Sequence, residues 1–134
     1  MEPYVLVVDD FPDGADMLAE YLRFRGLQVV TATDGAEAIE IAIAQPPKLI
    51  LMDLTMPGID GWEATRRLKA HPQTKDVLVI AVTANAFAHD EAKARAAGVD
   101  GFVVKPLDIK TLGDNVTAIM RSGRTALTAL RKRA

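Results

Sequence analysis

The sequence predicts an α/β fold in which a parallel sheet of five strands is covered by helices on both faces. Short apolar runs rich in β-branched residues alternate with longer segments whose apolar residues recur at helical spacing. Five such strand–helix units follow one another with short connections. This alternation is typical of a doubly wound parallel sheet, in which each crossover is right-handed.

The expected boundaries of the strands and helices lie where the spacing of apolar residues changes and where turn-forming residues occur. The expected strands cover residues 4–8, 27–32, 49–52, 77–82 and 101–104, and the expected helices cover residues 13–25, 36–44, 60–69, 88–97 and 108–120. Gly26 supplies a C-cap for the first helix, and Asp13 is expected to cap its start. Pro46 and Pro47 stop the second helix, because proline cannot continue it.

Length and composition limit the class of protein. The 134 residues suffice for one domain, which we expect over residues 1–121, followed by a basic tail over residues 122–134. There is no cysteine, so disulfides, zinc–thiolate sites and thiol nucleophiles are excluded. No apolar run approaches the roughly 20 residues of a membrane span, and the N-terminus does not resemble a signal peptide. We therefore expect a cytoplasmic protein with no membrane partner.

The distribution of charge argues against a nucleic-acid partner. The net charge is −2, but five of the 16 basic residues and none of the 18 acidic residues lie in residues 121–134. The body of the chain is therefore acidic, which is unfavourable for binding a phosphate backbone. The basic tail is too short to reverse that conclusion.

Polar residues suited to chemistry follow several of the expected strands. Asp9 and Asp10 follow the first strand, Asp53 the third, Thr83 the fourth and Lys105 the fifth. Because the carboxyl ends of parallel strands line one crevice, these side chains should share one pocket. Three clustered carboxylates repel one another, and a hard cation that prefers oxygen ligands, such as Mg²⁺, would relieve that repulsion.

Each of these residues also has a purely structural interpretation. The aspartate pair could cap the first helix, and Asp53 could form the turn that continues to Gly58. Thr83 could cap a helix or form a side-chain turn, and Lys105 could be a solvated charge. These local roles do not explain why all four sites fall at one edge of the sheet.

Several short segments match a known family in order. They are Val7-Val8-Asp9-Asp10, Leu51-Met52-Asp53 with Met56-Pro57-Gly58, Val82-Thr83-Ala84, and Phe102-Val103-Val104-Lys105-Pro106. With these segments in this order, the chain resembles the receiver domain of two-component response regulators (CheY-like) over about residues 4–120. The resemblance implies a flavodoxin-like parallel sheet of strand order 2-1-3-4-5 with five helices.

The resemblance implies a phosphoacceptor and a metal site. Asp53 would accept the phosphoryl group. Mg²⁺ would be held by Asp10, Asp53 and the main-chain carbonyl of Thr55, with Asp9 acting through a water. Phosphoryl transfer requires mainly in-line positioning and charge neutralisation, which suits this set of residues.

The resemblance also implies a switch. Thr83 would bind the phosphoryl group after transfer, and Lys105 would pair first with Asp53 and then with that group. Ala84 would leave an approach path, and Asn85, like Thr55, would border the attacking water. Phe102 matches an aromatic position that changes rotamer on activation, although it could also be permanently buried core.

The implied function is that of a two-component signalling protein and not of a conventional enzyme. The donor would be a sensor histidine kinase or a histidine phosphotransfer protein. The face formed by residues 88–97, 101–104 and 108–120 would contact an unknown output protein or a second copy of the chain. No DNA-binding or enzymatic output segment is recognised, so we expect either a stand-alone receiver, which we favour, or a receiver excised from a larger protein. The bond between Lys105 and Pro106 is expected to be cis.

Other interpretations remain open. A flavodoxin-like cofactor binder needs a phosphate loop after the first strand, where Asp9 and Asp10 would repel phosphate. An aspartyl phosphatase typically carries a second acid two residues after its nucleophile, where this chain has Thr55. A degenerate receiver that only binds proteins usually lacks an acid, the threonine or the lysine. A receiver that acts as a phosphate sink is a further alternative.

Overall fold

The computed structural model describes residues 2–54, 56, 58–84, 92, 93 and 95–127 and contains the predicted five-stranded sheet. The strands are β1 (Val5–Val8), β2 (Val29–Ala32), β3 (Leu49–Asp53), β4 (Leu78–Thr83) and β5 (Gly101–Val104). All neighbouring strands are parallel, in the order β2-β1-β3-β4-β5. The predicted flavodoxin-like fold class is therefore confirmed.

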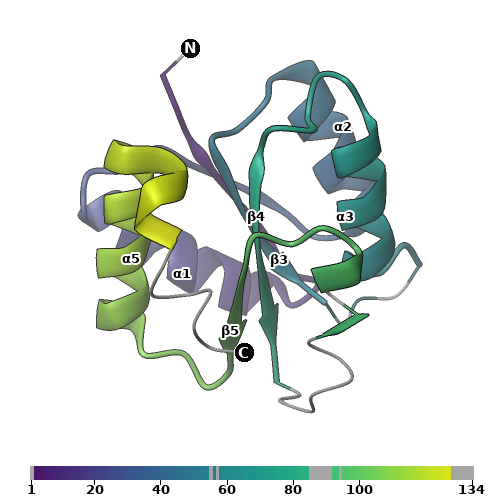
Figure 1. Ribbon diagram of the computed structural model, residues 1–134. Coiled ribbons are helices and arrows are strands. Elements are labelled where there is room, and N and C mark those ends of the chain that lie inside the picture. Colours follow the sequence, from purple (N-terminus) through teal and green to yellow (C-terminus); the bar gives the residue numbers. More distant parts are fainter. Residues whose placement is uncertain (1, 55, 57, 85–91, 94, 128–134) are drawn as a thin grey trace.

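The helices cover both faces of this sheet. They are α1 (Pro12–Phe24), α2 (Gly35–Ala44), α3 (Gly61–Ala70) and α5 (Ile109–Ser122), with a short 3₁₀ helix, η1 (Gly123–Leu127), after α5. Figure 1 shows α1 and α5 on one face and α2 and α3 on the other. Five helices were predicted, and the structure describes four of them in full; of the predicted helix over residues 88–97, the described residues 92, 93, 95 and 96 are helical.

Aspartate side chains start three of the helices. The N-caps of α2, α3 and α5 are Asp34, Asp60 and Asp108, and each side chain accepts a hydrogen bond from a backbone N–H in the first turn. Helix α1 differs, because its N-cap is Phe11 and no side chain caps it. The prediction that Asp13 caps α1 is therefore wrong.

Two apolar layers sandwich the sheet. Side chains alternate along each strand, so Leu6, Ile50 and Val79 face one layer while Val7, Leu51 and Ile80 face the other. The first layer packs against α2 and α3, and the second against α1 and α5. Because both faces are covered, the open edge at the carboxyl ends of the strands is where polar side chains gather.

The segment after α5 folds back onto the domain. Residues 123–127, which the sequence places in a basic tail, form η1, and Leu127 is fully buried in the layer shared with α1 and α5. Arg124 in this turn donates to Asp100 at 2.8 Å. Residues 128–134 lie outside the described part of the chain. Within the described part, no helix has the length and apolarity needed to cross a bilayer.

Candidate phosphoryl-transfer site

Three carboxylates meet at the carboxyl end of the sheet. Asp9 follows β1 directly, Asp10 is the next residue, and Asp53 is the last residue of β3. One oxygen atom from each lies within 4.8 Å of the others. Asp53 is buried, Asp9 is half-buried and Asp10 is exposed. The cluster offers oxygen donors only, which is the donor chemistry that a hard divalent cation prefers.

One ammonium group faces this cluster. The Nζ atom of Lys105 lies 3.8 Å from Oδ2 of Asp9 and 3.8 Å from Oδ2 of Asp53. Its backbone N–H donates to the carbonyl of Thr83 at 2.7 Å, which extends the β4–β5 pairing and holds Lys105 at the sheet edge. The Lys105–Pro106 bond is cis, as predicted. The structure therefore brings Asp9, Asp10, Asp53 and Lys105 together, as the sequence predicts.

Backbone contacts fix the position of Asp9. Its N–H donates to the carbonyl of Ala32 at 3.1 Å, next to the β1–β2 pairing. Its Oδ1 atom accepts the backbone N–H of Phe11 at 2.9 Å. With one carboxylate oxygen held in this way, the other is left to face Lys105.

A glycine under Asp53 was missed by the sequence analysis. A Cβ atom at Gly61 would collide with the carbonyl oxygen of Asp53 and would lie 2.7 Å from Cα of Leu54. Only glycine therefore allows the start of α3 to pack directly beneath the end of β3. The sequence signal is the Asp60-Gly61 pair, in which the aspartate begins the predicted helix and the glycine follows it directly.

The residues predicted to form the switch lie on β4 and β5. Thr83 ends β4 and is 2% exposed, while Phe102 on β5 is 1% exposed and pairs with Ala81 of β4. By the alternation of β4, Thr83 and Ala81 share the sheet face on which Phe102 is packed. Ala84 follows Thr83 and is exposed. The predicted site residues Thr55 and Asn85 lie outside the described residues.

A cavity of about 330 Å³ extends from the carboxylates. It is lined by Asp9, Asp10, Asp53 and Lys105 and by apolar residues that the sequence does not predict to be part of the site: Val7, Val8, Phe11, Gly14, Leu18, Leu51, Val82 and Leu107. Most of these apolar residues belong to the layer between the sheet and α1. No local sequence pattern reports such a cavity, because residues from β1, α1, β3, β4 and the segment after β5 all contribute to it.

Comparison with known proteins identifies the family. The family model described as "Response regulator receiver domain" matches residues 5–117. Among curated relatives, protein PilH of Pseudomonas aeruginosa is 33% identical over 116 residues, which are 87% of this chain and 96% of PilH. The transcriptional regulatory protein PrrA of Mycobacterium tuberculosis is 38% identical over 125 residues, which are 92% of this chain and 53% of PrrA.

Other relatives and solved structures agree. The chain is 31% identical over 119 residues to the DNA-binding regulator RpaA of Synechocystis sp., covering 89% of this chain and 49% of RpaA. It thus spans about half the length of RpaA and PrrA. The chemotaxis protein CheY4 of Vibrio cholerae superposes with a TM-score of 0.82 at 28% identity, covering 89% of this chain and 99% of that one. The chain belongs to the response regulator receiver domain family of two-component systems.

Proposed function

We propose that this chain is a phosphoacceptor switch in which Asp53 takes a phosphoryl group from a phosphohistidine. The donor would be a sensor histidine kinase or a histidine phosphotransfer protein. The observation that supports this most strongly is the buried Asp53 carboxylate, clustered with two further carboxylates and faced by the Lys105 ammonium at 3.8 Å. The carboxylate can act as the nucleophile, and the positive charge beside it is suited to stabilising a transferring phosphoryl group.

The proposal includes a Mg²⁺ ion. Asp10, Asp53 and the main-chain carbonyl of Thr55 would hold it, with Asp9 acting through a water. The oxygen-only donors of the carboxylate cluster support this assignment. When bound, the ion supplies positive charge opposite the oxygens of the phosphoryl group.

The proposed transfer is a nucleophilic displacement at phosphorus. An oxygen of Asp53 forms the new P–O bond while the P–N bond of the phosphohistidine breaks, and the electron pair remains on the imidazole nitrogen. Lys105 then pairs with the phosphoryl oxygens of the acyl phosphate. The exposed, small Ala84 supports an open approach to this site, and we place the later attacking water near Asn85 and Thr55.

The proposed output is a change of surface. Thr83 would move toward the phosphoryl group, and Phe102 would respond on the same sheet face. The changed face would be formed by the segment before β5, by β5 and by α5, and it would contact an unknown output protein or a second copy of the chain. The proposal includes a cytoplasmic location, which the lack of cysteine fits.

The nucleophile can be tested directly. Asp53→Asn should abolish incorporation of phosphate from acetyl phosphate and Mg²⁺, measured by intact mass. Asp76→Asn is the matched control, because Asp76 is an exposed aspartate outside the carboxylate cluster. Undiminished labelling of the Asp53 variant would remove the basis of the proposal.

A further inference from the structure

We propose that Gly35 is a positioning residue for the metal site, although it has no side chain to offer as a ligand and lies in the helix that follows the edge strand β2. Its missing side chain lets the start of α2 pack against Ile59, in the segment that follows Asp53. The inference rests on the proposed function, which assigns one metal ligand, the carbonyl of Thr55, to that segment. Replacing Gly35 should therefore lower the affinity for Mg²⁺ while every proposed ligand is still present.

Close approach, and not backbone conformation, requires glycine at this position. A Cβ atom at Gly35 would lie 2.5 Å from the carbonyl oxygen of Ile59 and 3.0 Å from its Cγ2 atom. Gly35 is buried at the first position of α2, and its φ angle lies outside the left-handed region. In a helix, alanine is favoured over glycine by about 1 kcal/mol. The contact with Ile59 therefore explains the glycine.

Two hydrogen bonds fix the first turn of α2. The Asp34 side chain accepts the backbone N–H of Glu37 at 2.8 Å, and the Glu37 side chain accepts that of Thr33 at 2.7 Å. Just before this turn, the carbonyl of Ala32 accepts the backbone N–H of Asp9 at 3.1 Å. The turn between β2 and α2 thus contacts both the aspartate that follows β1 and the segment that follows β3.

The segment that follows Asp53 is held at both of its ends. The backbone N–H of Leu54 donates to the carbonyl of Val82 at 3.1 Å, and that of Gly61 donates to the carbonyl of Leu54 at 3.2 Å. Ile59 lies between these two hydrogen bonds and packs against the apolar layer next to α2 and α3. Because the ends of the segment and the start of α2 are fixed, a displacement of Ile59 moves the residues between Leu54 and Gly61.

Two metal ions distinguish a change of geometry from a general loss of stability. Mg²⁺ requires nearly octahedral ligands at about 2.0–2.1 Å, whereas Ca²⁺ accepts less regular sets of ligands at about 2.3–2.6 Å. A displaced main-chain ligand should therefore reduce the affinity for Mg²⁺ more than the affinity for Ca²⁺. A loss of overall stability alone would not change the ratio of these two affinities in the folded protein.

The experiment measures both affinities in the full chain by titration followed by NMR amide shifts. Gly35→Ala should lower the affinity for Mg²⁺ by about ten-fold and that for Ca²⁺ by less than about three-fold. Gly113→Ala is the matched control, because a Cβ atom there would also meet neighbouring atoms at 2.7 Å, but between α5 and α1. The control should leave both affinities unchanged.

A second pair of variants tests the same contact from the side of Ile59. Ile59→Ala removes the side chain that packs between the start of α2 and the apolar layer, so it should lower the affinity for Mg²⁺ by about three-fold. Ile41→Ala is its control, because Ile41 is half-buried against the same layer but lies near the end of α2. If Gly35→Ala does not fold, this pair decides.

The outcomes separate this inference from the proposed function. A selective loss of Mg²⁺ affinity in the Gly35 variant, with weaker Mg²⁺ binding in the Ile59 variant and unchanged controls, supports the positioning role. Unchanged affinities in both variants, or equal losses in the controls, overturn it, while labelling of Asp53 still supports the phosphoacceptor. If the unsubstituted chain binds no Mg²⁺ and is not labelled, the proposed function fails and the positioning role fails with it.

Discussion

At the scale of single residues, two aspartates three positions apart have different surroundings. Asp10 is exposed, but one of its oxygens lies within 4.8 Å of oxygens of Asp9 and Asp53. Asp13 is also exposed, but it lies in the first turn of α1 and outside that cluster. The same side chain thus contributes to a candidate metal site in one position and only to the surface charge of a helix in the other.

This pair gives a matched test of the metal site. Asp10→Ala should weaken Mg²⁺ binding by about ten-fold or more, because a direct carboxylate ligand is lost. Asp13→Ala should change the affinity little, because it alters only nearby surface charge. Titration followed by NMR amide shifts measures both affinities. Equal weakening in the two variants would mean that the metal site is misplaced.

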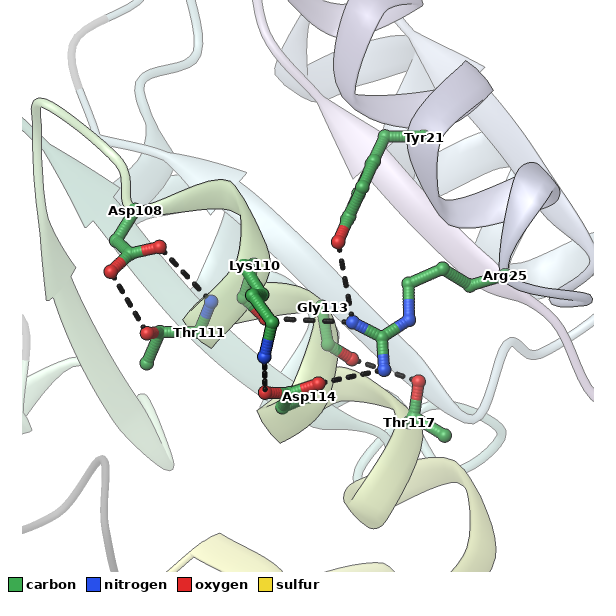
Figure 2. Close-up of polar contacts among 8 residues, drawn as sticks. All are labelled: Tyr21, Arg25, Asp108, Lys110, Thr111, Gly113, Asp114 and Thr117. Carbon is green, nitrogen blue, oxygen red and sulfur yellow. Dashed lines mark hydrogen bonds and ion pairs between the residues drawn. The ribbon is translucent and has the colours of Figure 1, made fainter.

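At the scale of elements, α1 and α5 are joined by a polar contact around Arg25 (Figure 2). One guanidinium nitrogen of Arg25 lies 2.8 Å from Asp114, and the other donates to the Tyr21 hydroxyl at 3.3 Å and to the Lys110 carbonyl at 3.5 Å. The hydrogen bond from Arg25 lowers the pKa of the Asp114 carboxyl. Gly113 makes this approach possible, since its missing side chain leaves room for Arg25 and Tyr21.

A double-mutant cycle tests this close approach. A Cβ atom at position 113 would lie 2.7 Å from both Nη1 of Arg25 and Cε2 of Tyr21. Gly113→Ala should therefore cost about 1–2 kcal/mol through this clash, partly offset by about 1 kcal/mol of better helix propensity. In an Arg25→Ala background part of the clash is relieved, so the same substitution should be neutral or stabilising.

Urea unfolding of the four proteins gives the four free energies of the cycle. A cost of Gly113→Ala that is identical with and without Arg25 would show that the two residues do not compete for space.

The end of α1 shows how far local sequence signals reach. Gly26 was predicted to stop the helix, and it does so with a φ of 91°. The backbone N–H of Gly26 donates to the carbonyl of Arg23, and that of Leu27 donates to the carbonyl of Leu22. These two hydrogen bonds form a Schellman motif. Leu27, predicted to begin a strand, therefore belongs to the helix cap, and β2 begins at Val29. An apolar residue after a C-cap glycine is compatible both with a helix cap and with the start of a strand. The sequence pattern alone therefore could not decide whether Leu27 belongs to the cap of α1 or to β2.

At the scale of the whole molecule, Asp100 shows what local signals cannot predict. It accepts from Lys69 of α3 at 2.7 Å, from the N–H of Val79 in β4 at 2.9 Å and from Arg124 of η1 at 2.8 Å. Burial alone would raise the pKa of Asp100, but these donors outweigh it and lower the pKa. The donors lie 21 to 31 residues away in sequence, so only the folded topology brings them together.

The site at the strand ends, in contrast, could be predicted from the sequence, because a general rule of parallel sheets places its residues together. Asp9 and Lys105 each follow a recognisable strand and Asp53 ends one, and a parallel sheet places all carboxyl ends at one edge. The apolar cavity next to them depends on side-chain packing between elements and has no such rule. Leu127 is a similar case, because it is fully buried although no helical or strand periodicity in the segment around it predicts burial.

The proposed transmission of a signal would also depend on the whole molecule. Thr83 and Phe102 are both buried, and Phe102 lies opposite the small Ala81 in the β4–β5 pairing. If Thr83 follows a phosphoryl group on Asp53, space next to Ala81 changes on the face where Phe102 packs. A chain that accepts phosphate without this response would be a phosphate sink.

Beryllofluoride with Mg²⁺ mimics the acyl phosphate and separates these two roles. In the switch, amide shifts should spread from the carboxylate cluster to Thr83, Ala84, Phe102 and α5, and Thr83→Ala should shrink the shift at Phe102. Thr74→Ala is the control, because Thr74 is also buried but its hydroxyl donates to the carbonyl of Leu68, away from the cluster. That variant should keep the full shift at Phe102. Shifts confined to the residues around Asp53 would instead favour the phosphate sink, because the structural change would then not extend to β5 or to the face that β5 forms with α5.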